Sequence, residues 1–320
     1  MTAPRVLVWL TDNAGPKHYR FDVPVEVLQA RGWQVDYGVP GPDLAERYDV
    51  LIGQRLHGPQ PDWEQICADG KVLCIYEIDD DLTRLPPDHF SYPYFEPQVD
   101  GTVAALRAGH RVTVPNQAFA DRMLELAPDT DIRILPICLP DEVYTYPLSQ
   151  PSDRLVVGWG GSWAAQHDWD GAALLDPLVG WMTQHPEAEF HTMGADYTNN
   201  RVARLRVTGM QPPLPFYQGI DFHIGLAPLA DVPFNSTKQH TKALYYAARG
   251  AAPICSPVGA YPQFIAATGI GLLSTSFAGG WAEALDILAT TRRQPDDIRD
   301  SVRDYAISQH IHQWEQAWTP

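Results

Sequence analysis

Two lysines stand four residues apart in a stretch that predicts a helix over Thr237–Arg249. The expected caps are Asn235 or Ser236 at its start and Gly250 at its end. Lys238 and Lys242 would share one face of the first two turns, where their mutual repulsion and the helix dipole oppose them. A diphosphate between the two ammonium groups would reverse that cost, so we expect one there. The alternative is a solvated basic face.

A glycine-rich stretch, Gly158-Trp159-Gly160-Gly161-Ser162, follows a run of apolar residues that predicts a strand over Leu155–Gly158. Glycines in a turn let backbone N–H groups approach a phosphate, and the Ser162 hydroxyl adds a donor. A tight turn without a ligand needs the same residues. The polar residues that follow could bind a metal, but we favour hydrogen-bonding and capping roles for them: His167, Asp168 and Asp170.

Three adjacent carboxylates, Asp79-Asp80-Asp81, end another predicted strand. Such carboxylates raise one another's pKa and attract cations or sugar hydroxyls. An aspartate-rich turn that caps the next segment is the structural alternative. Further polar or glycine residues are expected in loops at the ends of neighbouring strands: Gly15, Tyr19, Arg20, Arg55 and His57.

The elements that must position these residues alternate along the chain. Short apolar runs predict strands over Val6–Leu10, Val35–Gly38, Val50–Gln54, Val72–Tyr76, Val112–Val114, Ile132–Leu135, Leu155–Gly158, Glu189–Thr192, Phe222–Ala227, Ala252–Cys255 and Ile270–Leu273. Amphipathic segments predict helices over Pro24–Arg31, Asp62–Asp69, Gln98–Ala108, Ala118–Leu126, Gly171–Gln184, Thr237–Arg249, Tyr261–Ala267, Gly279–Arg292 and about Pro295–His312. This alternation predicts an α/β protein with parallel sheets.

A proline-rich break over Leu139–Asp153 predicts a linker between two Rossmann-like domains, residues 1–148 and 149–320, that face a cleft. The final helix could pack back on the first domain. Because ligands of open parallel sheets sit at the carboxyl ends of the strands, the candidate residues fall where chemistry is expected.

The composition narrows the class of partner. The 320 residues carry 23 basic and 39 acidic side chains, a formal net charge of −16, which disfavours nucleic acid as a partner or acceptor. The four cysteines form no Cys-x-x-Cys pair, and no apolar run reaches the roughly 20 residues of a membrane helix. We therefore expect a cytoplasmic protein without a bound cofactor or an integral membrane segment.

Taken in order, these pieces resemble a GT-B glycosyltransferase of the large retaining group 1 type. The resemblance runs through nearly the whole chain, over Tyr19-Arg20, the segment ending at Arg55, Glu77–Leu82, Leu135-Pro136, Gly158–Ser162, Ala227–Leu229, Phe234-Asn235, Lys238, Lys242 and Gly250–Ser256. Such enzymes bind a nucleotide-diphosphate sugar mainly in the second domain and an acceptor mainly in the first. The resemblance implies hexose transfer to a hydroxyl acceptor without a metal.

The resemblance also implies roles for single residues. The donor would be held by Gly15, Gly160, Gly161, Ser162, Asn235, Lys238, Lys242 and Tyr245, and the acceptor side would include Tyr19, Arg20 and Arg55. Catalytic roles fall to Asp80, Asp81 and Lys242. The lysines would stabilise the charge that develops on the departing diphosphate.

One departure affects the donor. Many relatives carry two glutamates on the lysine-bearing helix, where this chain has Thr237 and Tyr245. Ribose recognition must then differ, or use the Tyr245 hydroxyl. Two alternatives stay open: a non-catalytic nucleotide-sugar-binding protein, and a metal-dependent transferase that uses Asp79–Asp81 in the other glycosyltransferase architecture. The sequence identifies neither the acceptor nor the donor base and sugar.

Overall fold

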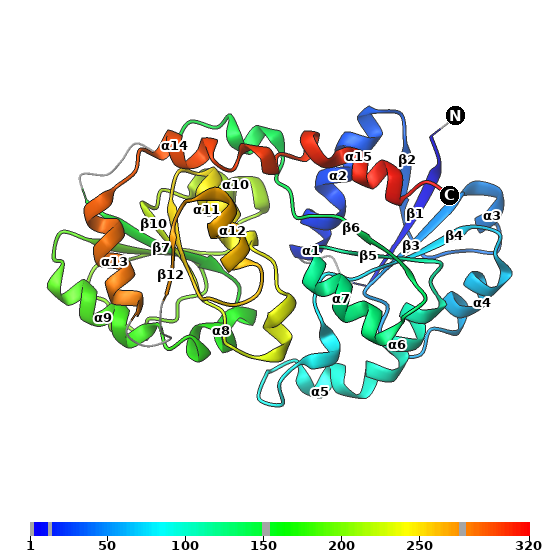
Figure 1. Ribbon diagram of the computed structural model, residues 1–320, viewed down its shortest axis with the longest axis horizontal. Coiled ribbons are helices and arrows are strands. Elements are labelled where there is room, and N and C mark those ends of the chain that lie inside the picture. The colour runs from blue at the N-terminus through cyan, green and yellow to red at the C-terminus, as the bar shows by residue number, and fades with distance from the viewer. Residues whose placement is uncertain (1–2, 12–14, 149–153, 275–279) are drawn as a thin grey trace. The chain divides into compact units, whose positions relative to one another are not determined.

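The computed structural model describes residues 3–11, 15–148, 154–274 and 280–320 (Figure 1). The chain divides into two compact units. Unit 1 comprises Met1–Leu139 and Ile307–Pro320, and unit 2 comprises Pro140–Ala306. The last segment of the chain therefore belongs to the same unit as the first.

Unit 1 contains a parallel sheet of six strands in the order β2-β1-β3-β4-β5-β6. The strands are β1 (Arg5–Leu10), β2 (Gln34–Tyr37), β3 (Val50–Gln54), β4 (Leu73–Glu77), β5 (Arg111–Val114) and β6 (Asp131–Ile134). Every residue of β3 is buried. A sheet covered on both faces needs such continuous apolar strands, which explains why the sequence runs are readable as strands.

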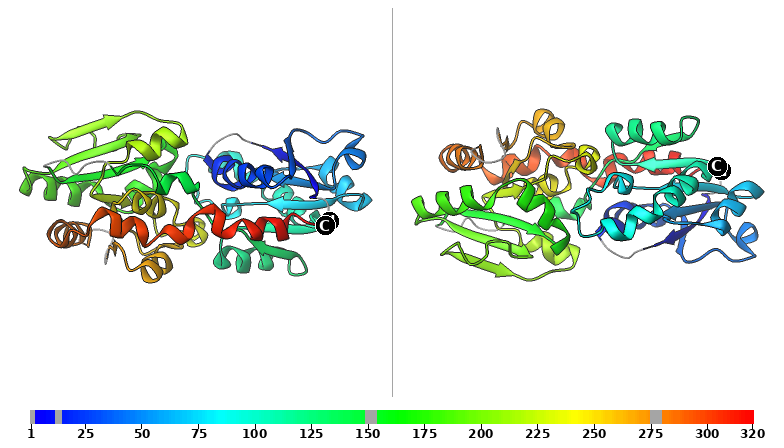
Figure 2. Two further views of the ribbon diagram at one scale, coloured as in Figure 1. Left: turned by 90° about the horizontal axis from the view of Figure 1, so that it is seen from above. Right: turned by 90° about the horizontal axis from the view of Figure 1, so that it is seen from below.

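Helices cover both faces of this sheet. They are α1 (Gly15–Lys17), α2 (Val23–Ala30), α3 (Leu44–Arg47), α4 (Pro61–Asp69), α5 (Tyr92–Phe95), α6 (Val99–Ala108), α7 (Gln117–Leu126) and α15 (Ile307–Ala317), with a π-helical turn η1 (His18–Asp22) and 3₁₀ turns η2 (Leu82–Arg84) and η3 (Glu96–Gln98). Helices α2 and α15 pack side by side, and α4 packs against α6 (Figures 1 and 2). The rings of Phe21 and Trp318 lie 6.1 Å apart in the core between α2, α15 and the sheet.

Unit 2 repeats this plan with the parallel strand order β12-β11-β10-β7-β8-β9. The strands are β7 (Val156–Gly161), β8 (Glu189–Gly194), β9 (Leu205–Thr208), β10 (Ile224–Ala227), β11 (Ala252–Cys255) and β12 (Leu272–Leu273). The helices are α8 (Gln166–Gly171), α9 (Leu175–Gln184), α10 (Pro213–Gly219), α11 (Thr241–Ala248), α12 (Tyr261–Thr268), α13 (Gly280–Thr291) and α14 (Pro295–Asp300), and the 3₁₀ turns are η4 (Asp141–Tyr144), η5 (Trp163–Ala165), η6 (Pro233–Thr237) and η7 (Arg303–Tyr305).

The predicted fold class, α/β with two Rossmann-like parallel sheets, is confirmed. All eleven predicted strands overlap observed ones, but the sequence reading missed β9. That strand lies at the sheet edge, and none of its four residues is fully buried. It therefore lacks the continuous apolar run that identifies the other strands.

Three predicted segments differ from the structure. The expected helix over Gly171–Gln184 begins only at Leu175. The expected final helix is two helices, α14 and α15, separated by η7. The expected linker contains η4, and two carbonyls of this region, those of Tyr146 and Pro147, accept hydrogen bonds from Arg249. Residues 149–153 of the linker lie outside the described part of the chain.

Candidate functional site

The carboxyl edge of the unit 2 sheet has a point where the strand order reverses. Strand β7 comes first in this unit, β8 and β9 lie on one side of it, and β10, β11 and β12 lie on the other. In doubly wound sheets, ligands bind in the crevice outside the carboxyl ends of the strands at such a reversal. The segments that leave β7 and β10 at this point lead to Ser162 and to Lys242.

Lys242 lies in the first turn of α11 and reaches the end of β7. A Cβ built on Gly161 would stand 3.5 Å from the Lys242 Nζ, so the ammonium group lies against the main chain at the strand end. The next residue, Ser162, is exposed. The structure thus brings Lys242, Gly161 and Ser162 together, as the sequence predicted.

The two glycines serve packing rather than a turn, which corrects the predicted glycine-rich turn. Strand β7 continues through Gly161, and neither Gly160 nor Gly161 has a positive φ. A Cβ on Gly160 would lie 2.7 Å from the Phe216 Cζ, and one on Gly161 would lie 2.7 Å from the Trp159 Cζ2. Glycine is required at both positions because aromatic rings pack directly on the strand.

Two tyrosine hydroxyls form hydrogen bonds with the main-chain groups of Gly160. Its N–H donates to the Tyr246 hydroxyl at 2.8 Å, and its carbonyl accepts from the Tyr245 hydroxyl at 3.2 Å. The N–H of Gly160 is therefore already bonded and does not face a phosphate. Tyr245 is 4% exposed, and its ring packs against that of Phe216 at 5.1 Å, so the predicted contact of this hydroxyl with the donor ribose is not made in this conformation.

The predicted placement of Lys238 on a helix face with Lys242 is wrong. Helix α11 begins at Thr241, and Lys238 precedes it in an extended conformation with φ −62° and ψ 149°. The Lys238 Nζ stands 4.5 Å from the centroid of the Phe234 ring, a cation–π contact. The predicted stop at Gly250 is confirmed, with φ +79° directly after the helix.

The predicted caps are also wrong, because Asn235 is bonded elsewhere. Its Nδ2 donates to the Asp168 Oδ1 at 2.6 Å and to the Ala230 carbonyl at 2.9 Å. Asn235 is fully buried, so it orients the loop after β10 and does not contact the donor in this conformation. The Ser236 hydroxyl donates to the Pro233 carbonyl. Asp168 takes the hydrogen-bonding role that the sequence favoured over metal binding.

One aromatic residue at this edge was missed by the sequence reading. Trp163 directly follows Ser162 and is 67% exposed. Its ring packs edge-on against that of Tyr197 at 5.7 Å, and the Tyr197 hydroxyl donates to the Ser162 carbonyl at 2.9 Å. The position of Trp163 next to the glycine-rich stretch could have indicated it from the sequence. No sequence pattern indicates Tyr197, because it is distant in sequence.

In unit 1, Arg20 forms a buried ion pair, which corrects its predicted acceptor-side role. Its guanidinium donates to Glu77 at 2.6 Å and 3.2 Å and also to the Leu135 carbonyl, and it is 2% exposed. Thr113 donates to the same carboxylate. Burial raises the pKa of Glu77, and the Arg20 charge opposes that rise. Arg20 therefore ties η1 to the sheet and has no surface for an acceptor.

Arg55 joins two of the three predicted carboxylates at the end of β3. Its Nε donates to Asp79, and its Nη2 donates to Asp80 at 2.9 Å. Its backbone has a φ of +48°, a strained conformation that clusters at functional sites. The strand order of this unit reverses between β1 and β3, so Arg55 stands at the edge position where a ligand is expected.

The exposure of the three aspartates separates their roles. The Asp80 side chain is 24% exposed and that of Asp79 is 15% exposed. Burial raises the pKa of Asp79, the Asp80 charge adds to the rise, and Arg55 opposes it. Among the three, Asp80 has the carboxylate that a ligand can reach most easily.

Asp81 is a structural carboxylate, which corrects its predicted catalytic role. Its side chain is fully buried and accepts from the Arg122 Nε at 3.0 Å. It also caps η2 by accepting from the Thr83 N–H at 3.2 Å. These contacts match the capping alternative that the sequence left open, and they keep Asp81 from touching a substrate.

The remaining unit 1 candidates differ in exposure. Gly15 is exposed and a Cβ there would meet no atom within 4 Å, so packing does not require a glycine. Tyr19 is half-buried in η1. Sequence reading missed Gln54, which precedes Arg55: it is fully buried, and its amide atoms have no hydrogen-bond partner among the described residues.

No group of three or more metal-ligating side chains occurs among the described residues. Among the helices of the described residues, none is both long enough and apolar enough to span a membrane.

Comparisons with solved structures identify the fold. A sucrose-phosphate synthase from Thermosynechococcus elongatus matches with a TM-score of 0.67 and 16% identity over 98% of each chain. HepE of Anabaena, solved in complex with UDP-glucose, matches with a TM-score of 0.63 and 13% identity, again over 98% of each chain. The chain therefore has the GT-B fold of nucleotide-sugar glycosyltransferases.

The same fold also occurs in a protein that is assigned an activity other than glycosyl transfer. A protein from Listeria monocytogenes with a provisional assignment as a UDP-N-acetylglucosamine 2-epimerase matches with a TM-score of 0.58 and 10% identity, over 98% of this chain and 94% of that one. No protein-family model matches the chain, and no curated protein matches its sequence. The function must therefore be argued from the site.

Proposed function

We propose that the chain is a glycosyltransferase that moves a sugar from a nucleotide-diphosphate sugar to a hydroxyl acceptor, with retention and without a metal. The observation that carries the proposal is the Lys242 ammonium group beside Gly161, at the strand-order reversal of unit 2. The UDP-glucose bound by HepE, which shares the fold, supports UDP as the first donor nucleotide to test.

The transfer reaction requires positive charge beside the departing diphosphate. The bond between the sugar C1 and the donor phosphate oxygen breaks, a bond from C1 to the acceptor oxygen forms on the same face, and the acceptor proton leaves to the departing diphosphate. Negative charge therefore develops on that diphosphate, and a fixed cation stabilises it. Lys242 supplies the cation, Ser162 is exposed beside it, and Lys238 stands on the segment that leads into α11.

In unit 1, the proposed acceptor-side groups are Asp80 and Arg55. The Asp80 carboxylate can accept a hydrogen bond from a substrate hydroxyl and so orient it, and Arg55 holds that carboxylate in place. Asp81 then acts as a positioning residue, because it fixes the turn that carries Asp80.

The metal-dependent alternative loses its main structural basis. The other glycosyltransferase architecture uses one mixed sheet, whereas this chain has two parallel sheets. The groups expected to bind the metal instead pair with arginines: Asp79 and Asp80 with Arg55, and Asp81 with Arg122. Transfer that survives a chelator would agree with the metal-free reaction, and transfer abolished by the chelator and restored by Mg²⁺ or Mn²⁺ would contradict it.

The non-catalytic alternative rests on the positions where relatives carry glutamates. Thr237 and Tyr245 bring no carboxylate there, and each is 4% exposed. A panel of nucleotide sugars incubated without acceptor separates the two functions. Slow release of free sugar and nucleoside diphosphate supports the enzyme, whereas tight binding without any release, with or without candidate acceptors, supports the binding protein.

A further inference from the structure

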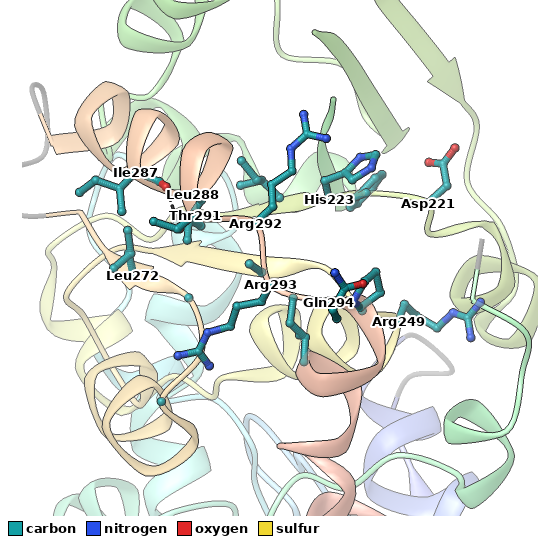
Figure 3. A pocket seen from close by; sticks show the side chains of 18 residues that line it. Asp221, His223, Arg249, Leu272, Ile287, Leu288, Thr291, Arg292, Arg293 and Gln294 are labelled. Atoms are coloured by element: carbon teal, nitrogen blue, oxygen red, sulfur yellow. Dashed lines mark hydrogen bonds between the residues drawn. The ribbon is translucent and has the colours of Figure 1, made fainter. Parts of the chain in front are cut away.

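A cavity of about 440 Å³ lies in unit 2, away from the candidate site. It opens at the amino ends of β10 and β11, the sheet edge opposite the one that carries Gly161. The end of α13 and the turn that leads into α14 complete its wall (Figure 3). Its volume falls in the range of small-molecule sites. None of the residues predicted to bind donor or acceptor lines it.

One side of this cavity is apolar. Leu272 from β12 and Ile287 and Leu288 from α13 stand together on one side of the view in Figure 3, and Ile298 of α14 also contributes. Ile287 is 43% exposed, which is unusual for a large apolar side chain in the wall of a cavity. Contact with an apolar ligand would remove this surface from water.

Arg249 lines the other side and is a buried cation without a carboxylate partner. It is 4% exposed, and its guanidinium donates to the carbonyls of Tyr146 at 3.3 Å and Pro147 at 2.7 Å. Its Nε is buried without a hydrogen-bond partner, and no carboxylate forms an ion pair with it among the described residues. The two carbonyls and the Tyr146 ring, whose centroid lies 5.7 Å from the Arg249 Cζ, hold this guanidinium, so it adds positive charge beside the cavity without contacting a ligand directly.

The rest of the lining adds to the positive charge. Arg292 and Arg293 follow α13, both are exposed, and neither has an ion pair within the described chain. Asp221 is the one acidic residue among the described lining residues, and its carboxylate already binds His191 at 2.8 Å and Arg206 at 2.7 Å. A chain with a net charge of −16 therefore concentrates unpaired arginines around one cavity.

His223 lines the same cavity with a neutral ring whose polar atoms do not face the ligand. Its Nδ1 accepts from the Val156 N–H at 3.0 Å, so the neutral ring carries its proton on Nε2. Nε2 is buried and has no partner among the described residues. Burial and the nearby Arg292 charge lower the pKa of His223, which keeps the ring neutral at pH 7.

We propose that this cavity binds a small organic anion, in which an apolar body packs against Leu272 and Leu288 and a phosphate, sulfonate or carboxylate group faces Arg292 and Arg293. This binding site is separate from the proposed transfer reaction and does not depend on it. The combination of an apolar wall with two exposed arginines that form no ion pair among the described residues, beside the buried charge of Arg249, selects for an amphipathic anion over a neutral or cationic ligand.

Two neighbouring threonines provide a matched test of the location. Thr291 lines the cavity and Thr290 does not, yet both are exposed at the end of α13 and both donate their hydroxyl to the carbonyl four residues earlier at 2.8 Å. The probe is 8-anilinonaphthalene-1-sulfonate, an aromatic sulfonate, titrated by calorimetry into the full chain. We expect saturable binding that Thr291→Phe weakens at least tenfold and Thr290→Phe leaves within twofold. Absence of saturable binding, or equal affinities in the two variants, would overturn the proposal.

A second comparison tests the charge. The double variant Arg292→Gln with Arg293→Gln should weaken binding of the probe at least tenfold, while Arg303→Gln, which changes an exposed arginine paired with Asp300, should not. Phenyl phosphate and benzoate should compete with the probe, and phenol should not. Competition by phenol as strong as that by the two anions would contradict an anion site, and so would equal loss in the double variant and Arg303→Gln.

Discussion

Replacing His240 with phenylalanine should remove a large part of the acid sensitivity of unit 2. His240 precedes α11, and its ring stacks on that of Phe264 at a centroid distance of 4.8 Å and meets the ring of Tyr305 edge-on at 5.2 Å. Its Nε2 is buried without a hydrogen-bond partner in the described structure. Burial lowers the pKa of His240 from 6.5 to about 4.

The sign follows from which state binds the proton. Between pH 6.5 and pH 4 the unfolded chain protonates this histidine and the native chain does not, so the stability present at neutral pH is lost as the pH falls. A pKa lowered from 6.5 to about 4 corresponds to about 3 kcal/mol of unfolding free energy in full, of which about 2 kcal/mol is lost between pH 7 and pH 5. Phenylalanine keeps the stacked ring and has no proton to gain.

Urea unfolding at pH 7 and pH 5 measures this difference. The free energy of unfolding of the His240→Phe variant should fall by about 2 kcal/mol less over this interval than that of the unmodified chain. Every other residue is the same in both proteins, so its contribution cancels in the comparison. Equal losses in both proteins would refute the assignment of a neutral His240, with its Nε2 buried, at the start of the helix that carries Lys242.

Three further variants test the surroundings of the candidate sites. Asn235→Ala should lower the unfolding free energy by about 1–3 kcal/mol in urea unfolding, since it removes the buried donor shared by the half-buried Asp168 carboxylate and the Ala230 carbonyl; an unchanged midpoint would contradict that role. Gly161→Ala should lower the free energy of unfolding by about 1–3 kcal/mol in thermal unfolding, because the new Cβ meets the Trp159 ring. An unchanged stability would contradict this packing role, because it would mean that the Trp159 ring moves aside without cost. Asp80→Asn should slow sugar transfer at least tenfold in a product assay and leave nucleotide affinity within about twofold, while the exposed control Asp62→Asn should change neither; equal rates in the two variants would remove Asp80 from the reaction.

The strands were readable from the sequence because both sheets are buried on two faces. The observed bounds of β3 and β11 match the predicted ones, and every residue in both strands is buried. The π-helical turn η1 was not predicted, because it depends on Arg20 reaching Glu77 and the Leu135 carbonyl, which are distant in sequence.

The start of α11 shows why the site was only partly predictable. Asn235 and Ser236 have the residue types of a helix cap, and local preference favours a helix through Lys238. The Asn235 amide instead binds Asp168, which is 67 residues away, and the segment after η6 becomes extended. Lys242 kept its predicted neighbour, because the order of strands fixes where β7 ends and where α11 begins.

The glycine-rich stretch shows the opposite case, where correct residues were assigned the wrong physical reason. Gly160 and Gly161 read as a phosphate turn, but aromatic rings from α10 and from β7 itself require them. Such packing between residues distant in sequence leaves no local pattern, so a glycine alone does not distinguish a ligand from a ring.

Calorimetric titration of UDP tests whether Lys242 binds the diphosphate, with three proteins compared: the unmodified chain, Lys242→Ala and Lys71→Ala. Lys71 is exposed in unit 1, so its loss changes the net charge equally without touching the β7 end. A lost charge-assisted phosphate contact corresponds to about 1.5–3 kcal/mol, or roughly 10- to 150-fold in affinity. We expect Lys242→Ala to weaken UDP binding at least tenfold and Lys71→Ala to bind UDP like the unmodified chain. Equal affinity in all three proteins would contradict this role of Lys242.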